Sequence, residues 1–283
     1  MEGLWILFVF IYSLLKGSRD GMKKAALKKS SSDEILFFYS LIGFLLIIPF
    51  SQNAFSTKPI YIFYTFLKAC AVGSSWMLAY VALKGMSVSL YGVMDMSRMV
   101  FSMMFGIVLL GESLTWQKLV GATLVITGLF MVNLKKDSGN SKTKPLVLLA
   151  ALANCLLNSI SATMDKVLMK DMEADQLQFW FMLFLLVIYS FILMGKREKI
   201  SISSLKGNYW VPLMSISLIF GDRLLFIANS SPESQITIMT LIKQSSVLVT
   251  VITGWLFFKE KNIAFKLMCS LIILIGIFIS VNL

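Results

Sequence analysis

The chain has 283 residues, 57% of them apolar, and a mean hydropathy of +0.80. A soluble domain of this size would leave far too much apolar surface in water, so the composition excludes a soluble protein and places the chain in a membrane. The formal net charge of +11 does not indicate a nucleic-acid partner, because basic residues of a membrane protein mark its orientation.

Ten apolar stretches follow one another along the chain. About 20 helical residues, each rising about 1.5 Å, cross a hydrocarbon core of about 30 Å. The predicted spans are residues 4–25, 35–50, 61–83, 89–110, 116–134, 145–168, 177–194, 209–228, 235–258 and 264–282. Backbone groups cannot stay unpaired in lipid and the alternation of a β-barrel is absent, so we predict an all-α membrane protein with ten transmembrane helices.

The second half of the chain repeats the first. The segment Gly111–Thr115, with the sequence Gly-Glu-Ser-Leu-Thr, returns more loosely 148 residues later around Glu260. At a shift of 142 residues, the spacing of Tyr12, Lys16, Arg19 and Lys23 is repeated by Asn154, Asn158, Ser161 and Asp165. With five spans in each half, the second half would enter the membrane from the opposite side, which gives inverted-topology repeats, a common build of secondary transporters. We assign residues 1–134 to the first repeat, 135–145 to a polar linker and 146–283 to the second repeat.

The basic residues of the loops are unequally divided. Loops after odd-numbered spans carry sixteen Lys or Arg residues, and loops after even-numbered spans carry four. The positive-inside rule therefore predicts cytoplasmic odd loops and external termini, in a multi-pass protein of the plasma (inner) membrane.

Six cations lie within the predicted spans, and three carboxylates accompany them. The cations are Lys16, Arg19, Lys68, Arg98, Arg223 and Lys243, and the carboxylates are Asp20, Asp95 and Asp222. A charge at the centre of a spanning helix costs about 2.5 to 3.5 kcal/mol when it faces lipid, so these side chains should face the protein interior. The surplus of cations predicts a water-filled interior or an anionic ligand.

Helical spacing gathers some of these charges on common faces. The fourth span has a polar stripe of Tyr91, Asp95, Arg98 and Ser102, and the ninth has one of Thr240, Lys243, Gln244 and Thr250. Because the two helices are equivalent in the repeat, Arg98 and Lys243 could converge on one ligand. The alternative is that Asp95 and Arg98 form an ordinary intrahelical pair. Asp222 and Arg223 are adjacent and point in different directions, which leaves Lys243 as a candidate partner of Asp222.

Several other residues allow two interpretations. Lys16 and Arg19 continue toward Lys23 as the wall of a polar pathway, whereas Lys68 either lines that pathway or snorkels to the interface. Trp76, like Tyr91, either lines a pocket or fills packing space.

The turns between helices carry the repeated glutamates. Glu112 and Glu260 lie at helix ends, where capping or loop fixing is expected rather than substrate binding. The three cysteines fall inside apolar stretches and predict no disulfide.

The two five-span halves and the Leu110–Thr115 segment, followed by a helix with Gly121 and Gly128, resemble the EamA-type branch of the drug/metabolite transporter superfamily. The resemblance covers nearly the whole chain. It implies transport of a metabolite and a central cavity lined by spans one, three, four, six, eight and nine, the set that carries all six cations. The family usually has a proline partway along the fourth and ninth spans, where this chain has Arg98–Met99 and Ser246–Val247.

We therefore predict a secondary transporter that moves a small anionic or zwitterionic metabolite by alternating access. The candidate substrate-binding residues are Arg98, Lys243, Arg223, Lys16, Asp95, Asp222, Arg19, Tyr91, Trp76 and Asn158. Arg98 and Lys243 would hold the carboxylate or phosphate of the substrate, and Asp95 and Asp222 would orient the cations when the site is empty. The expected partners are the substrate and membrane lipid, with no nucleic acid, and the chain should be a monomer or a weak homodimer.

Two other function classes remain open. One is an organic cation or multidrug carrier coupled to protons through Asp95 or Asp222, and the other is a non-transporting membrane assembly subunit. An enzyme is not expected, because the chain has no histidine and no recognisable nucleophile or metal motif. No catalytic residue, metal ligand or cofactor is predicted.

Overall fold

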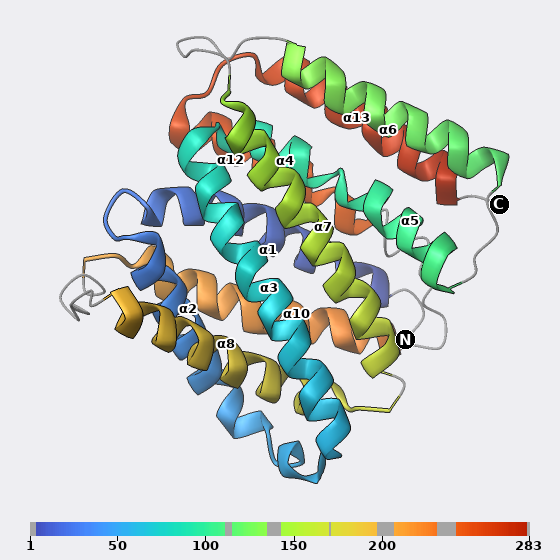
Figure 1. Ribbon diagram of the computed structural model, residues 1–283. Coiled ribbons are helices and arrows are strands. Elements are labelled where there is room, and N and C mark those ends of the chain that lie inside the picture. Colours follow the sequence, from blue (N-terminus) through green and yellow to red (C-terminus); the bar gives the residue numbers. More distant parts are fainter. Residues whose placement is uncertain are drawn as a thin grey trace.

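The computed structural model describes residues 4–110, 115–134, 143–169, 171–196, 207–230 and 242–281. Every secondary-structure element in these ranges is a helix (Figure 1). The elements are α1 (Leu4–Ala26), α2 (Ser32–Ile47), η1 (Ile48–Phe50), η2 (Ala54–Ser56), α3 (Pro59–Gly85), α4 (Val88–Asp95), α5 (Arg98–Leu110), α6 (Trp116–Leu134), α7 (Pro145–Leu168), α8 (Ala174–Lys196), α10 (Trp210–Ser230), α12 (Ser246–Phe258) and α13 (Ile263–Val281). Glu112, Thr240 and most of the predicted linker lie outside the described residues.

Four helical stretches are long and apolar enough to cross a membrane on composition alone. They are Ser32–Phe50, Pro59–Gly85, Pro145–Asp165 and Ala174–Lys196, and shorter apolar helices occur at Leu119–Val132, Ile242–Phe258 and Ile263–Ile279. Helices α3 and α7 begin at prolines, because the fixed φ of proline suits the first helical position and its missing N–H is not needed there. The all-helical membrane fold is confirmed, whereas the count of ten spans stays a prediction.

The fourth predicted span is not one helix, which corrects the prediction of a continuous span over 89–110. Helix α4 ends at Asp95 and α5 begins at Arg98, with a turn at Met96 and Ser97. Around the turn the backbone bonds tighten to a three-residue spacing, as in the bond from the Ser97 N–H to the Met94 carbonyl at 3.0 Å.

Neighbouring side chains stabilise this break. A broken helix is tolerated at membrane depth when other groups satisfy its freed backbone carbonyls. The Met99 N–H donates to the Met96 carbonyl at 3.1 Å, so the Asp95 carbonyl loses its usual helical donor, and the Cys155 thiol of α7 lies 3.8 Å from this oxygen and 3.6 Å from the Met94 carbonyl. Ser159 of α7 donates its hydroxyl to the Arg98 carbonyl at 3.0 Å.

The second half has an equivalent break. Ser245, 148 residues after Ser97, is a turn residue before α12. The N–H of Leu248 donates to the Ser245 carbonyl at 2.9 Å, as that of Val100 donates to Ser97 at 3.0 Å. Here the carbonyl of Ile242 accepts from Ser13 of α1, the residue equivalent to Cys155. Each half therefore supports the broken helix of the other.

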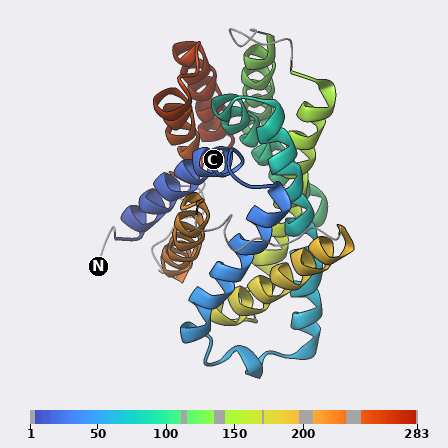
Figure 2. The same cartoon turned by 90° about the vertical axis from the view of Figure 1, so that its left-hand side faces the viewer.

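Most helix pairs join the two halves. Helix α6 packs on α13, α2 on α8, α4 on α12, and the pair of α1 with α10 matches that of α3 with α7. The views agree on this arrangement: α6 lies beside α13 in Figure 1, and α1 lies beside α10 in Figure 2.

The buried apolar residues form two main clusters. One packs around α2, α8 and α10, and the other around α4, α6, α12 and α13. Helix α3 contributes to both, with Val72 in the first and Ala79 in the second. Polar side chains lie between these two clusters, and they define the site described next.

Candidate functional site

A cavity of about 1230 Å³ opens between the two clusters. Its wall takes residues from α1, α2, α3, α4, α5, α6, α7, α8, α10 and α13, together with Lys243 and Gln244 before α12. All ten residues predicted to bind substrate lie on this wall: Arg98, Lys243, Arg223, Lys16, Asp95, Asp222, Arg19, Tyr91, Trp76 and Asn158. Among these ten, the cavity brings together side chains that are up to 227 positions apart in the sequence, Lys16 and Lys243.

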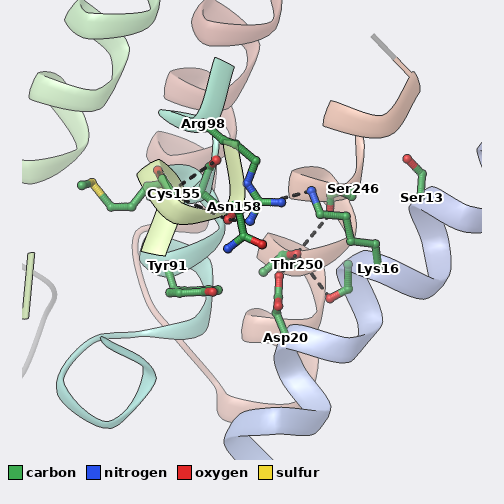
Figure 3. A network of polar contacts seen from close by, with 12 residues as sticks. Ser13, Lys16, Asp20, Tyr91, Arg98, Cys155, Asn158, Ser246 and Thr250 are labelled. Carbon is green, nitrogen blue, oxygen red and sulfur yellow. Dashed lines mark hydrogen bonds and ion pairs between the residues drawn. The ribbon is translucent and has the colours of Figure 1, made fainter. Parts of the chain in front are cut away.

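Two cations share one carboxylate at the broken helix. The Arg98 Nη2 atom lies 2.6 Å from Asp95 Oδ1, and the Lys16 Nζ atom of α1 lies 3.3 Å from Asp95 Oδ2. The pair of Asp95 with Arg98 expected from spacing is therefore present, although it joins the end of α4 to the start of α5, and α1 adds a second cation that spacing did not assign to it. Figure 3 shows Lys16 on α1 extending toward Arg98. We call Lys16, Asp95 and Arg98 the central cluster.

An amide network flanks the central cluster. Asn154 Nδ2 donates to the Tyr91 hydroxyl at 3.2 Å, and Asn158 Nδ2 donates to Asn154 Oδ1 at 2.9 Å. Ser75 donates to Asn154 Oδ1 at 2.7 Å, so α3, α4 and α7 are tied together here. Asn158 and Tyr91 are predicted site residues, and both are bonded within the protein.

Asp165 binds a cation that sequence reasoning left without a partner. Its carboxylate lies 2.8 Å from the Lys68 ammonium, which also lies 4.0 Å from the centre of the Phe181 ring. Lys68 therefore lines the cavity, and the alternative of snorkelling is wrong. The Phe181 ring in turn meets Trp76 at 6.3 Å, and Trp76 meets Tyr39 at 5.0 Å, which forms an aromatic wall.

Arg223 lies apart from the central cluster. Its Nη1 atom is 3.0 Å from Asp175 in the first turn of α8, and its guanidinium lies 4.3 Å from the centre of the Phe50 ring after α2. This pair therefore stands at the end of the cavity where α2 finishes and α8 begins.

Arg19 and Asp222 lie on facing helices α1 and α10. Arg19 is 6% exposed, its Nη1 atom has no hydrogen-bond partner among the described residues, and its guanidinium lies 6.0 Å from the centre of the Tyr12 ring. Asp222 interacts electrostatically with Arg19, Lys68 and Lys243. Lys243 thus lies within reach of Asp222, and it occupies the position that Asp95 holds in the first half, 148 residues earlier.

The charge balance of the cavity differs from the sequence count. Among the described residues, seven cations and six carboxylates line it, because Lys23, Asp165, Glu173 and Asp175 join the charges counted within the spans. The prediction of a large cation surplus is therefore wrong for the cavity as a whole. It holds locally, since the central cluster has two cations and one carboxylate.

Sequence reasoning missed several side chains of the wall, among them Asp165, Asp175 and Gln178. Asp165 could have been found, because it ends the stripe of Asn154, Asn158 and Ser161 on one face of a helix. Asp175 precedes the predicted span 177–194 and Gln178 lies at its start. Polar residues are common at the ends of spans, so these two gave no indication that they line a cavity.

Polar contacts join the turn after α12, the start of α4 and helix α13. Glu260 accepts from the N–H groups of Val88 and Ser89 at 2.6 and 3.0 Å and so caps α4. Lys266, only 4% exposed, donates to Ser89 Oγ at 2.7 Å and lies 3.7 Å from Glu260. The expected capping role of Glu260 is confirmed. The cavity wall itself includes Met169, Glu173 and Asp175 around the start of α8.

The comparisons with known proteins agree with this architecture. The model of the EamA-like transporter family matches the chain twice, over residues 3–134 and 145–282. A crystal structure of another protein superposes with a TM-score of 0.71 at 13% sequence identity, and the alignment covers 99% of this chain and 97% of that one. This likeness shows a shared fold. No curated protein matches the chain by sequence.

Proposed function

Because the chain belongs to the EamA-like transporter family, we propose that it is a secondary transporter that moves a small anionic or zwitterionic metabolite across the membrane by alternating access. Membership of this family indicates an integral membrane protein with a role in transport. The choice of substrate class is our inference from the cavity.

The central cluster carries this inference. One carboxylate faces two cations there, so the cluster keeps a local positive charge, and Arg98 Nε has no hydrogen-bond partner among the described residues. An unbalanced charge at membrane depth is unfavourable until an anion joins it. A carboxylate or phosphate of the substrate would supply that anion, and the planar guanidinium of Arg98 suits both.

Asp95 has a definite part in this proposal. It holds Lys16 and Arg98 in place while the site is empty, at 3.3 and 2.6 Å. When a substrate anion arrives at Arg98, Asp95 keeps Lys16 as its partner. The substrate is thus bound without leaving a carboxylate unpaired. The nearly balanced remainder of the wall favours a zwitterion over a multiply charged anion.

We further propose ten spans in two inverted five-span repeats, joined by the linker at 135–145, in the plasma membrane with external termini. The structural support is the equivalence of the two breaks at Ser97 and Ser245, each held by the first helix of the other half. Such paired, discontinuous helices allow one repeat to rock against the other around a central site.

The test is an uptake screen in proteoliposomes that contain only this chain. Amino acids, sugar phosphates, nucleotide sugars and amines are offered with and without a proton gradient. We expect uptake of at least one anion or zwitterion, and we expect Arg98→Gln to abolish it while folded yield stays near normal. Lys196→Gln is the matched control, because it removes an ion pair with Asp33 that lies outside the cavity. Full uptake by Arg98→Gln would refute the site.

A carrier of organic cations is the second candidate, favoured by the six carboxylates on the cavity wall. Uptake of quaternary amines alone, with loss on Asp222→Asn and not on Arg98→Gln, would replace our proposal with this one. An assembly subunit would show no uptake of any compound when the purified chain is folded.

A further inference from the structure

Gln178 is a buried amide that the protein leaves unpartnered. Its residue is 3% exposed and lines the cavity, yet neither its Nε2 nor its Oε1 atom has a hydrogen-bond partner among the described residues. Buried side-chain amides in folded proteins almost always have partners, because leaving them unpaired sacrifices their hydration. An exception on the wall of a binding cavity indicates a group that is kept for a ligand.

Gln176, two residues earlier on α8, is a glutamine whose side-chain amide has a structural role. It is also buried, at 9% exposed, but its amide is fully used. Its Nε2 donates to the Asn53 carbonyl at 3.2 Å and to Ser56 Oγ at 2.9 Å, and its Oε1 accepts from the Glu173 N–H at 3.0 Å. The two glutamines share a helix turn and differ in whether the protein satisfies them.

The neighbours of Gln178 are already committed to other partners. Asp175, Gln178 and Phe181 are three residues apart on α8 and all line the cavity, so they form one stripe. On one side of Gln178, Asp175 holds Arg223 at 3.0 Å. On the other side, the Phe181 ring carries the Lys68 ammonium. These contacts fix the wall around Gln178 without supplying a partner to its amide.

The surface next to Gln178 is aromatic. Phe181 is one helical turn away, and its ring leads to Trp76 at 6.3 Å and from there to Tyr39 at 5.0 Å. A planar substrate group can lie against these rings, since aromatic faces favour stacked or edge contacts with other flat groups.

Resting on the transport function proposed above, we propose that Gln178 is a specificity-determining residue for the substrate. It binds a planar group that presents a hydrogen-bond donor beside an acceptor, either a primary carboxamide or the lactam edge of a heterocycle. A side-chain amide offers the complementary pair, so two parallel hydrogen bonds form with such a group. The substrate is thus recognised at two places, with its anion at the central cluster and its amide-like group at Gln178.

An unpartnered amide at this position would also make the site selective among similar substrates. A site built to hydrogen-bond one substrate group rejects an analogue that lacks it far more strongly than an apolar pocket could, because the buried polar atoms are then left unpaired. We expect discrimination of at least about tenfold between matched ligands with and without the amide.

The test compares two nearly isosteric probes, 4-carbamoylbenzoate and 4-acetylbenzoate, by the thermal stabilisation that each gives to the purified chain. Both carry the carboxylate and the ring, but only the first adds an amide N–H. We expect at least about tenfold tighter binding of 4-carbamoylbenzoate by the native chain and equal binding of both probes by Gln178→Leu. Gln176→Leu should keep the preference.

The same variants separate a ligand-binding role from a structural one. Without ligand, Gln178→Leu should melt at the native temperature or above, since no protein hydrogen bond is lost, whereas Gln176→Leu should melt lower. Three results would each overturn the proposal. The first is equal binding of both probes by the native chain, including no binding of either, and the second is a preference that survives in Gln178→Leu. The third is a fall in the melting temperature of Gln178→Leu as large as that of Gln176→Leu. Because binding is measured without transport, a failed uptake screen would refute the transport function independently.

Discussion

At the scale of single residues, the cavity is a set of ion pairs between helices. Lys68 of α3 pairs with Asp165 of α7, and Arg223 of α10 pairs with Asp175 of α8. The central cluster departs from one-to-one pairing, with two cations on one carboxylate. Breaking a buried pair by removing one member leaves the other charge uncompensated, which is more damaging than never having the pair.

Asp95→Asn should therefore destabilise the empty protein strongly. It leaves Lys16 and Arg98 without their carboxylate at a position where Asp95 is about 10% exposed, and loss of one partner of a buried pair costs about 3 to 5 kcal/mol. We expect a lower melting temperature in detergent, and a larger rise on adding the transported anion than in the native protein, because the anion replaces the lost charge. Asp165→Asn is the control, since its side chain is 38% exposed and it should lose less. An Asp95→Asn protein that melts at the native temperature would contradict the pairing.

The residues of the site could largely be predicted, but their pairing could not. Lys16, Arg98 and Asp222 stand out because charges are rare in apolar helices. Their partners lie on helices far away in the sequence, as Asp165 does for Lys68, and spacing along one helix says nothing about them. Gln178 could not be found at all, because its importance lies in bonds that the protein does not make.

At the scale of helices, the decisive features are the break before Arg98 and the cap of α4. Neither proline nor glycine stands at the turn of Met96 and Ser97, and the polar residues there are spaced as a stripe of one continuous helix. Cys155 and Ser159 of another helix contact backbone carbonyls on either side of the turn. Sequence-based reading therefore gave the position of the span and missed its interruption.

The Glu260 cap should stabilise the first turn of α4. Glu260→Ala removes the acceptor of two backbone N–H groups and the partner of Lys266. Hydrogen bonds to a charged group contribute about 1.5 to 3 kcal/mol, so amide hydrogen exchange in the first turn of α4 should speed up by about tenfold or more. The matched control is Glu34→Ala, which removes the capping box of α2 and should affect only the start of that helix. Unchanged exchange at residues 88–91 would show that α4 does not depend on Glu260.

At the scale of the whole molecule, the two halves are interleaved rather than set side by side as independent units. Helix α6 packs against α13 so closely that a Cβ on Gly276 would lie 2.8 Å from the carbonyl oxygen of Gly121. Because each helix finds its main neighbours in the other half, neither half has a complete core of its own.

Separate expression tests this dependence. Residues 1–134 and 145–283 produced together as two polypeptides should copurify and restore uptake, whereas either one alone should be degraded or aggregate. Gly276→Leu in the second polypeptide should weaken the association because the side chain meets backbone of α6. Gly195→Leu should not, since no atom lies within 4 Å of a Cβ there. Stable accumulation of either half alone would contradict the interleaved core.

The exchange of charge between equivalent positions, Asp95 in one half and Lys243 in the other, bears on the kinetics of the cycle. If the two halves exchange conformations when the cavity opens to one face of the membrane and then to the other, the equivalent positions that a substrate meets first carry opposite charges on the two faces. The Michaelis constants for influx and efflux should then differ. The ratio of kcat/KM in the two directions must still equal the equilibrium constant. The difference in charge therefore sets the substrate concentration at which transport from each face is half-maximal. It cannot by itself drive accumulation of the substrate.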